Sequence, residues 1–119
     1  MKISNSEVNR LMLKLTGAGE LPKEYALSQN YPNPFNPTTG IKYALPVDSK
    51  VTMEIYNIVG QRVRTLVNNN MPAGYHAAEW DGTGTAGQQL ASGVYFLQMS
   101  ATGTNGKSFN ELRKLMMLK

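Results

Sequence analysis

Three prolines in one short segment constrain this chain more than any other feature. Pro32, Pro34 and Pro37 interrupt the stretch between Asn30 and Gly40. Each proline removes a backbone N–H donor and pushes the preceding residue toward extended geometry, which disfavours both a helix and a central strand. We therefore predict an ordered but irregular segment here, with Phe35 as its apolar anchor.

Downstream of this segment, apolar side chains recur at every second position between turns. Such alternation is typical of strands with one buried face. The intervening stretches contain glycine, proline or asparagine, which favour turns, and we expect a loop over residues 68–74. With 11 Gly and 6 Pro in the chain, a helical bundle is disfavoured. We predict strands within residues 25–29, 41–45, 51–59, 62–67, 75–80 and 94–101.

Residues 108–118 can be interpreted in two ways. Ser108 and Glu111 have capping-box spacing, and Phe109, Leu112 and Met116 would share one face of a helix. However, short strands at roughly 8–12-residue spacing predict an antiparallel sandwich, which needs a closing edge strand. The residues alone leave both possibilities open.

Residues 4–16 form an amphipathic pattern that predicts a short helix. Ser4 and Glu7 have capping-box spacing, and apolar residues recur with helical period at Val8, Leu11, Met12 and Leu15. An isolated helix of this length is marginal in water. It would have to dock on this domain, on a missing upstream domain or on a symmetry partner, so self-association through the N-terminal helix is one alternative.

The predicted organisation is one folded domain preceded by a linker. We assign residues 1–24 to an N-terminal helix and linker belonging to an upstream region, and residues 25–119 to the domain. Residues 1–15 lack the apolar run of a signal peptide. We therefore expect the chain to be a fragment from the end of a longer polypeptide.

Composition excludes several classes of function. The chain has no cysteine, which removes disulfides, thiolate metal sites and cysteine nucleophiles. Its net charge is +4, but the cations are scattered, so we expect a solvated surface and no nucleic-acid partner. No stretch approaches the ~20 apolar residues of a membrane span, so membrane insertion is not expected.

No constellation of catalytic or metal-ligating residues is evident. His76 is the single histidine and has no partner at metal-ligand spacing. Glu79 and Asp81 flank Trp80 and are best interpreted as solvated acids beside a buried tryptophan. The glycines of residues 82–87 lack the features of a phosphate loop. We therefore predict no enzyme activity, no metal and no cofactor.

The proline-rich segment resembles the opening motif of the type A C-terminal sorting domain of the type IX secretion system. The resemblance runs over about 95 residues. It continues through further short motifs, which are Ile41-Lys42-Tyr43-Ala44-Leu45-Pro46, Gly60-Gln61-Arg62-Val63-Arg64-Thr65-Leu66, Ala73-Gly74-Tyr75-His76, Trp80-Asp81-Gly82, Ala91-Ser92-Gly93-Val94-Tyr95-Phe96 and Lys114-Leu115-Met116-Met117-Leu118-Lys119. The same pattern is similar to the Ig-like domain of the flagellar hook-capping protein.

This resemblance implies an all-β fold, a seven-stranded immunoglobulin-like antiparallel β-sandwich, to which we add the short N-terminal helix. It favours a strand over residues 108–118. It implies a non-catalytic domain that directs an upstream cargo through the periplasm to the cell surface, with the outer-membrane secretion machinery and a surface peptidase as partners. The alternatives are a structural Ig-like module, as in hook-capping proteins, and a carbohydrate-binding accessory domain that uses Trp80 or Tyr31.

Two stretches and one glycine are the recognition candidates. The proline-rich segment would provide a rigid entry to the fold or a recognised surface, and Gly93 would allow a sharp turn into the next strand. The final strand could pair with a receptor strand by β-augmentation, with its lysines fixing the register. The candidate residues are Asn33, Pro34, Phe35, Asn36, Pro37, Gly93, Lys114 and Lys119.

Overall fold

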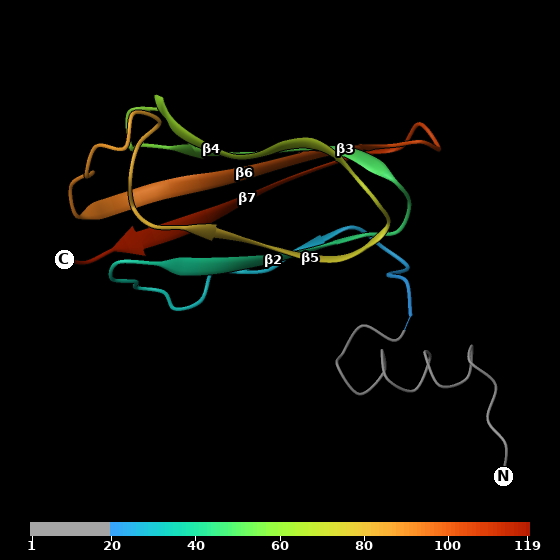
Figure 1. Ribbon diagram of the computed structural model, residues 1–119, viewed down its shortest axis with the longest axis horizontal. Helices are drawn as coiled ribbons and strands as arrows, with labels where there is room; N and C mark the ends of the chain where they lie inside the picture. The colour runs from blue at the N-terminus through green and yellow to red at the C-terminus, as the bar shows by residue number, and fades with distance from the viewer. Residues whose placement is uncertain (1–19) are drawn as a thin grey trace, which may run out of the picture.

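The computed structural model describes residues 20–119, which form a sandwich of two antiparallel sheets (Figure 1). The described chain begins at one end of the sandwich, and the C-terminus lies at the other (Figure 1). Seven strands make up the sheets: β1 (Ala26–Leu27), β2 (Thr39–Leu45), β3 (Ser49–Tyr56), β4 (Arg62–Met71), β5 (Gly74–Trp80), β6 (Gly93–Gly103) and β7 (Ser108–Met117).

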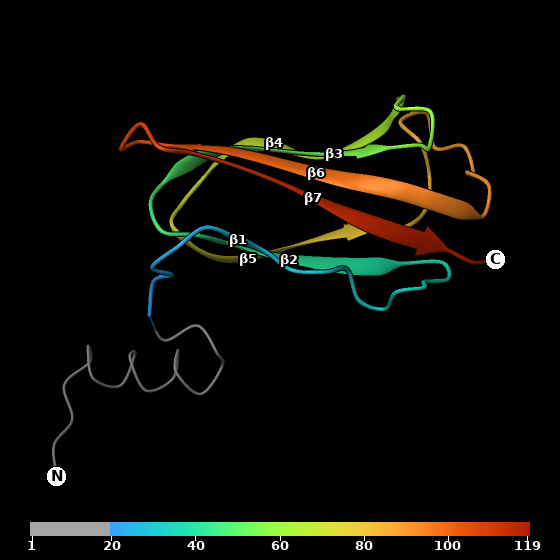
Figure 2. The same cartoon turned by 180° about the vertical axis from the view of Figure 1, so that it is seen from behind.

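The smaller sheet has the order β1-β2-β5, and the larger has the order β4-β3-β6-β7. Figure 2 shows the same two layers from behind. In the larger sheet β3 and β6 are central, while β4 and β7 form its edges. The longest pairing is that of β6 with β7, which runs from Gly93 opposite Met117 to Thr102 opposite Ser108.

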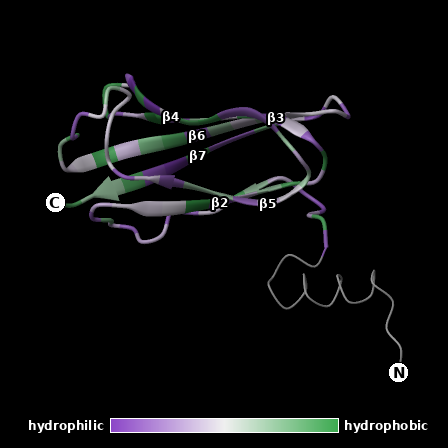
Figure 3. Cartoon of the chain, in the orientation of Figure 1, coloured by the Kyte–Doolittle hydropathy of each residue, from purple (hydrophilic) through white to green (hydrophobic). Residues whose placement is uncertain are grey.

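The core lies between the sheets because every second residue of the central strands points inward. Val51, Met53 and Ile55 of β3 are fully buried, and so are Leu97 and Met99 of β6. Figure 3 shows the resulting bands of hydrophobic and polar residues along β6. Burial of each such side chain contributes about 1.5–3 kcal/mol to the free energy of folding.

The fold-class prediction is wrong in one respect, because it included a short N-terminal helix. The described residues are all-β and contain no helix, so the fold class is a seven-stranded sandwich without that element. The pattern over residues 4–16 lies outside the described residues. Capping and an apolar stripe stabilise a helix of this length only marginally unless it packs on other structure.

Two predicted strand ends also need correction. The strand predicted within residues 51–59 ends at Tyr56, and Val59 is 73% exposed in the following turn. Residues 68–70 were expected in a loop, yet they extend β4 because they pair with Lys50–Thr52. The pairing across the sheet thus overrides the local preference of asparagine for turns.

Residues 108–117 form a strand, as the resemblance implied, and not a helix. Leu115 and Met117 point into the core, whereas Leu112 and Met116 are on the opposite face. In the described part of the chain, no helix is long and apolar enough to cross a membrane.

Candidate functional site

Phe35 anchors the proline-rich segment (residues 30–40) in the core. Its side chain is 1% exposed and packs against Trp80, with ring centroids 5.4 Å apart. Trp80 in turn meets the ring of Tyr95 edge-on at 5.2 Å, and its indole N–H donates to the carbonyl of Thr83 at 2.9 Å. The predicted anchor role of Phe35 is therefore confirmed, and so is the burial of Trp80.

The same segment pairs with the end of β7. The N–H of Phe35 donates to the carbonyl of Met116, and the N–H of Leu118 donates to the carbonyl of Phe35, both at 3.0 Å. The side-chain Oδ1 of Asn33 accepts the N–H of Met116 at 3.1 Å. Phe35 thus forms a parallel bridge with Met117, so the segment acts as one more short strand beside β7.

Residues just before the proline-rich segment cover the neighbouring part of the same edge. The side-chain amide of Gln29 donates to the carbonyl of Lys114 at 2.7 Å. The guanidinium of Arg113 donates to the carbonyl of Leu27 at 2.9 Å. The outer edge of β7 is therefore occupied by its own chain from Lys114 to Leu118, and a receptor strand could add only nearer to Ser108.

Asn30 and Thr39 form a buried polar pair that the sequence did not reveal. The side-chain amide of Asn30 donates to Thr39 Oγ1 at 3.0 Å and to the carbonyl of Pro32 at 3.1 Å. Thr39 Oγ1 donates to the same carbonyl at 2.8 Å. A carbonyl in a proline-rich segment lacks a regular strand partner and needs another donor, and this need was the available signal.

Two glycines shape the end of the sandwich around Met117. Gly93 is opposite Met117 and has a φ of +149°, a conformation that L side chains rarely adopt. Gly82 has a φ of +79°, and a Cβ there would lie 2.7 Å from the sulfur of Met117. Gly82 therefore also allows a close approach of two chain segments.

The two candidate lysines are exposed on β7 and just beyond it. Lys114 is opposite Phe96, and the main-chain N–H of Lys119 donates to Ser92 Oγ at 3.0 Å. Pro34, Asn36 and Pro37 are exposed on the surface of the proline-rich segment. The structure therefore brings the predicted residues together around the C-terminal part of β7, and their role in recognition stays a prediction.

His76 and Asp81, which were considered for catalysis, make contacts within the fold. His76 Nε2 lies 2.7 Å from the carbonyl of Pro72, and its ring stacks on Tyr43. The hydroxyl of Thr83, at 2.6 Å, and its N–H, at 3.1 Å, donate to Asp81 and hold the pKa of that carboxyl below its ordinary value. Among residues 20–119, no three His, Cys, Asp or Glu side chains are grouped so as to hold a metal ion.

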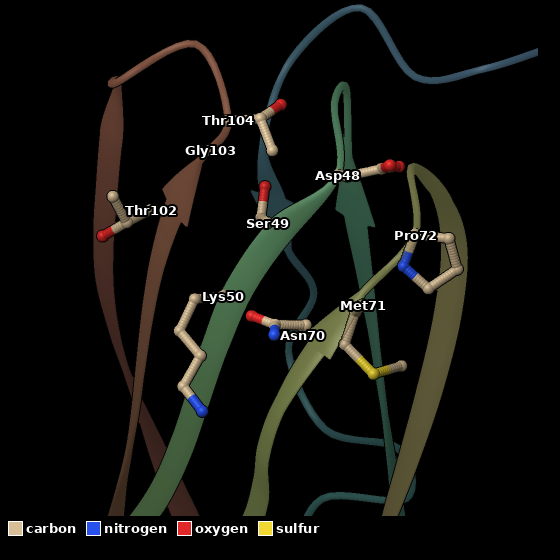
Figure 4. Close-up of a pocket in the computed structure, with 9 residues that line it drawn as sticks. All are labelled: Asp48, Ser49, Lys50, Asn70, Met71, Pro72, Thr102, Gly103 and Thr104. Carbon is tan, nitrogen blue, oxygen red and sulfur yellow. The ribbon is translucent and has the colours of Figure 1, made fainter.

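A polar hollow lies at the other end of the sandwich, with a volume of about 300 Å³ (Figure 4). Asp48 Oδ1 on its rim accepts the N–H of Ala73 at 2.8 Å, and Lys50 points away from Asp48 (Figure 4). Among the described residues, no buried side-chain polar atom lacks a hydrogen-bond partner.

The strand order and the segment that crosses from one sheet to the other define an immunoglobulin-like β-sandwich. The model of the FlgD Ig-like domain family matches residues 36–105, which is more than half of the chain. The chain therefore belongs to the FlgD Ig-like domain family, a family of structural modules. This confirms the expected similarity to the hook-capping protein. Among curated proteins, none matches the sequence.

Several solved structures share the fold. FlgD from Xanthomonas campestris is 25% identical, with a TM-score of 0.55 over 87% of this chain and 75% of its own. FlgD from P. aeruginosa is also 25% identical, with a TM-score of 0.53 over 66% of this chain and 60% of its own. Dimeric latent PorU from Porphyromonas gingivalis is 20% identical, with a TM-score of 0.63 over 84% of this chain. The chain spans only 10% of PorU, and that likeness concerns the fold alone.

Proposed function

We propose that this domain is a non-catalytic sorting and anchoring domain that directs a larger cargo through type IX secretion to the cell surface. The proposal is carried by the convergence of its motif residues. Phe35 and Gly93 are far apart in the sequence, yet both lie beside Met117, and Gly82 approaches the same side chain. The motifs that resemble the sorting family therefore form one end of the sandwich.

This arrangement suits recognition of a folded domain. The surface around Met117 combines the proline-rich segment, the turn after Trp80 and the end of β7, so it exists only when the sandwich has formed. A receptor that binds this surface would distinguish folded from unfolded cargo. By resemblance, the cargo crosses the periplasm, and a surface peptidase then acts on the exported protein.

A structural module, as in hook-capping proteins, is the second candidate. The family match and the 25% identity to FlgD from Xanthomonas campestris favour it. In that case the domain would function when it replaces the Ig-like domain of a FlgD protein. Motility of such a chimera would support this candidate over sorting.

The carbohydrate-binding alternative loses one of its two candidate residues, Trp80, to burial. Trp80 is fully buried and cannot stack on a sugar, while Tyr31 is 84% exposed and is held by the backbone pair it forms with Gly40. Sugar-binding surfaces of this kind need an accessible aromatic ring.

Charge reversal on the candidate surface tests the proposal. The chain would be fused behind a signal peptide and a folded reporter in a bacterium that has type IX secretion. We expect the double variant Lys114→Glu/Lys119→Glu to leave the reporter in the periplasm. The matched control Lys23→Glu/Lys107→Glu has the same change of charge at remote exposed sites and should be exported normally. Equal export of the two double variants would contradict a role for the end of β7.

A further inference from the structure

The turn between β3 and β4 holds two aliphatic side chains in solvent. Ile58 is 75% exposed and Val59 is 73% exposed. Polar residues are usual in such a turn because they are readily solvated. Two adjacent β-branched residues in this position leave apolar surface uncovered. Such surface indicates an interaction site when it continues over neighbouring strands.

The turn is held rigidly by its first residue. Asn57 Oδ1 accepts the N–H of Val59 at 3.1 Å and the N–H of Gln61 at 2.9 Å. The Asn57 carbonyl accepts the N–H of Gly60 at 3.0 Å, and Gly60 has a φ of +86°. A partner would therefore meet an ordered tip, and binding would cost little conformational entropy.

Behind this tip, a row of four residues crosses the outer face of the larger sheet. Tyr56 is opposite Phe96 on one side and Arg62 on the other. Phe96 is in turn opposite Lys114. Directly opposite residues share one face of a sheet. The cross-sheet row is therefore Lys114, Phe96, Tyr56 and Arg62, with two aromatic rings between two cations.

The two aromatic residues of the row and the tip line one apolar hollow. Its volume is about 280 Å³, just below the range of about 300–1,000 Å³ for small-molecule sites, so it suits a single side chain. Leu112 of β7 forms part of its wall and is 54% exposed. The lining residues are Tyr56, Asn57, Ile58, Gly60, Phe96, Gln98 and Leu112.

The charges around the hollow favour an acidic partner. Arg62 donates to Glu54 at 2.9 Å, so the acid nearest the row is already paired. Among residues 20–119, the ammonium group of Lys114 has no hydrogen bond or ion pair, and Lys114 is exposed. The charge of Arg62 is therefore offset by Glu54, and Lys114 carries the unpaired positive charge beside the row.

We propose that this face binds a protein segment that presents an aliphatic side chain flanked by carboxylates. The aliphatic group occupies the hollow beside Ile58, and a flanking carboxylate faces the ammonium group of Lys114 at the β7 end of the row. A concave hollow behind the tip favours a side chain over a flat lipid surface, which would engage only the tip. This interaction goes beyond the sorting role and does not depend on it.

A peptide titration tests this proposal. The probe is Ac-Gly-Asp-Leu-Asp-Leu-Asp-Gly-NH2, added to the 15N-labelled full chain and followed by amide chemical shifts. We expect shifts grouped at Ile58, Phe96 and Leu112. Affinity should be at least tenfold lower for the peptide with Lys in place of Asp, and likewise for the peptide with Ala in place of Leu.

Two variants distinguish this surface from the rest of the chain. Ile58→Ser should weaken binding of the acidic peptide at least tenfold, and Lys114→Glu should favour the lysine peptide. Lys107→Glu has the same change of charge away from the row and should bind as the wild type does. Equal shifts with the lysine peptide would overturn the proposal. So would shifts at Ile58 and Val59 with phosphatidylcholine–phosphatidylglycerol vesicles but none with the acidic peptide.

Discussion

Phe35 and Met117 lie side by side in a parallel β-bridge, although they come from opposite ends of the described chain. The bridge joins the proline-rich segment, which leaves the smaller sheet, to the last strand of the larger one. The aromatic anchor and the edge strand therefore close the sandwich together.

Removal of the anchor should strongly destabilise the domain. Phe35→Ala removes a fully buried ring that packs on Trp80, so the free energy of unfolding should fall by about 3–5 kcal/mol. Tyr31→Ala is the matched control in the same segment, because Tyr31 is 84% exposed, and it should cost less than about 0.5 kcal/mol. Urea denaturation would measure both, and similar losses would contradict the anchor role.

The side chain of Asn33 should protect one amide of β7. Asn33→Ala removes the acceptor of the Met116 N–H, so hydrogen exchange at Met116 should become faster, and stability should fall by about 1 kcal/mol. Asn36→Ala, in the same segment, should leave that exchange rate unchanged because Asn36 is exposed and does not pair with β7. Unchanged exchange at Met116 in Asn33→Ala would argue against this contact.

The glycines around Met117 should differ in their tolerance of a methyl group. At Gly93 a Cβ meets nothing within 4 Å, so Gly93→Ala should cost only the backbone strain of its positive φ, about 1–3 kcal/mol. Gly82→Ala should cost more, because its Cβ would also collide with the sulfur of Met117. Gly40→Ala is the control, with its nearest atom at 3.7 Å and no positive φ. Thermal unfolding would rank the three, and equal losses would contradict this account.

Asp81 should make stability depend on pH in a defined direction. Hydrogen bonds from Thr83 hold the pKa of Asp81 below its ordinary value of about 3.9 in the folded state. A lowered folded pKa stabilises the native state above the unfolded pKa, and this contribution is lost as pH falls through the folded pKa. The stability difference between wild type and Asp81→Asn should therefore be largest near pH 7 and shrink below about pH 4. A difference that stays constant down to pH 2 would contradict this role.

Much of the fold could be predicted from alternation and turn residues. A strand with one buried face was expected within residues 94–101, and its alternate residues Tyr95, Leu97 and Met99 are all buried. Val59 was misplaced because the turn begins at Asn57, whose side chain organises the hairpin before the alternation is complete. A polar residue that caps a turn can thus end a strand earlier than the apolar pattern indicates.

The contacts that form the candidate surface were harder to predict from the sequence. The importance of Phe35 followed from its isolation among prolines, but its contact with Met117 is long-range and leaves no local pattern. The buried pair of Asn30 and Thr39 was missed because both residues are ordinarily exposed or in turns. The hypothesis of an open edge along β7 could not anticipate that Gln29 and Asn33 cover part of it.

If the domain directs its cargo to type IX secretion, export of a fused reporter must depend on that system. The most direct measurement compares export of a folded reporter, fused ahead of the full chain, in a strain with the system and in an isogenic strain without its outer-membrane machinery. We predict reporter at the cell surface in the first strain and in the periplasm in the second. Equal retention in the periplasm of both strains would contradict the claim.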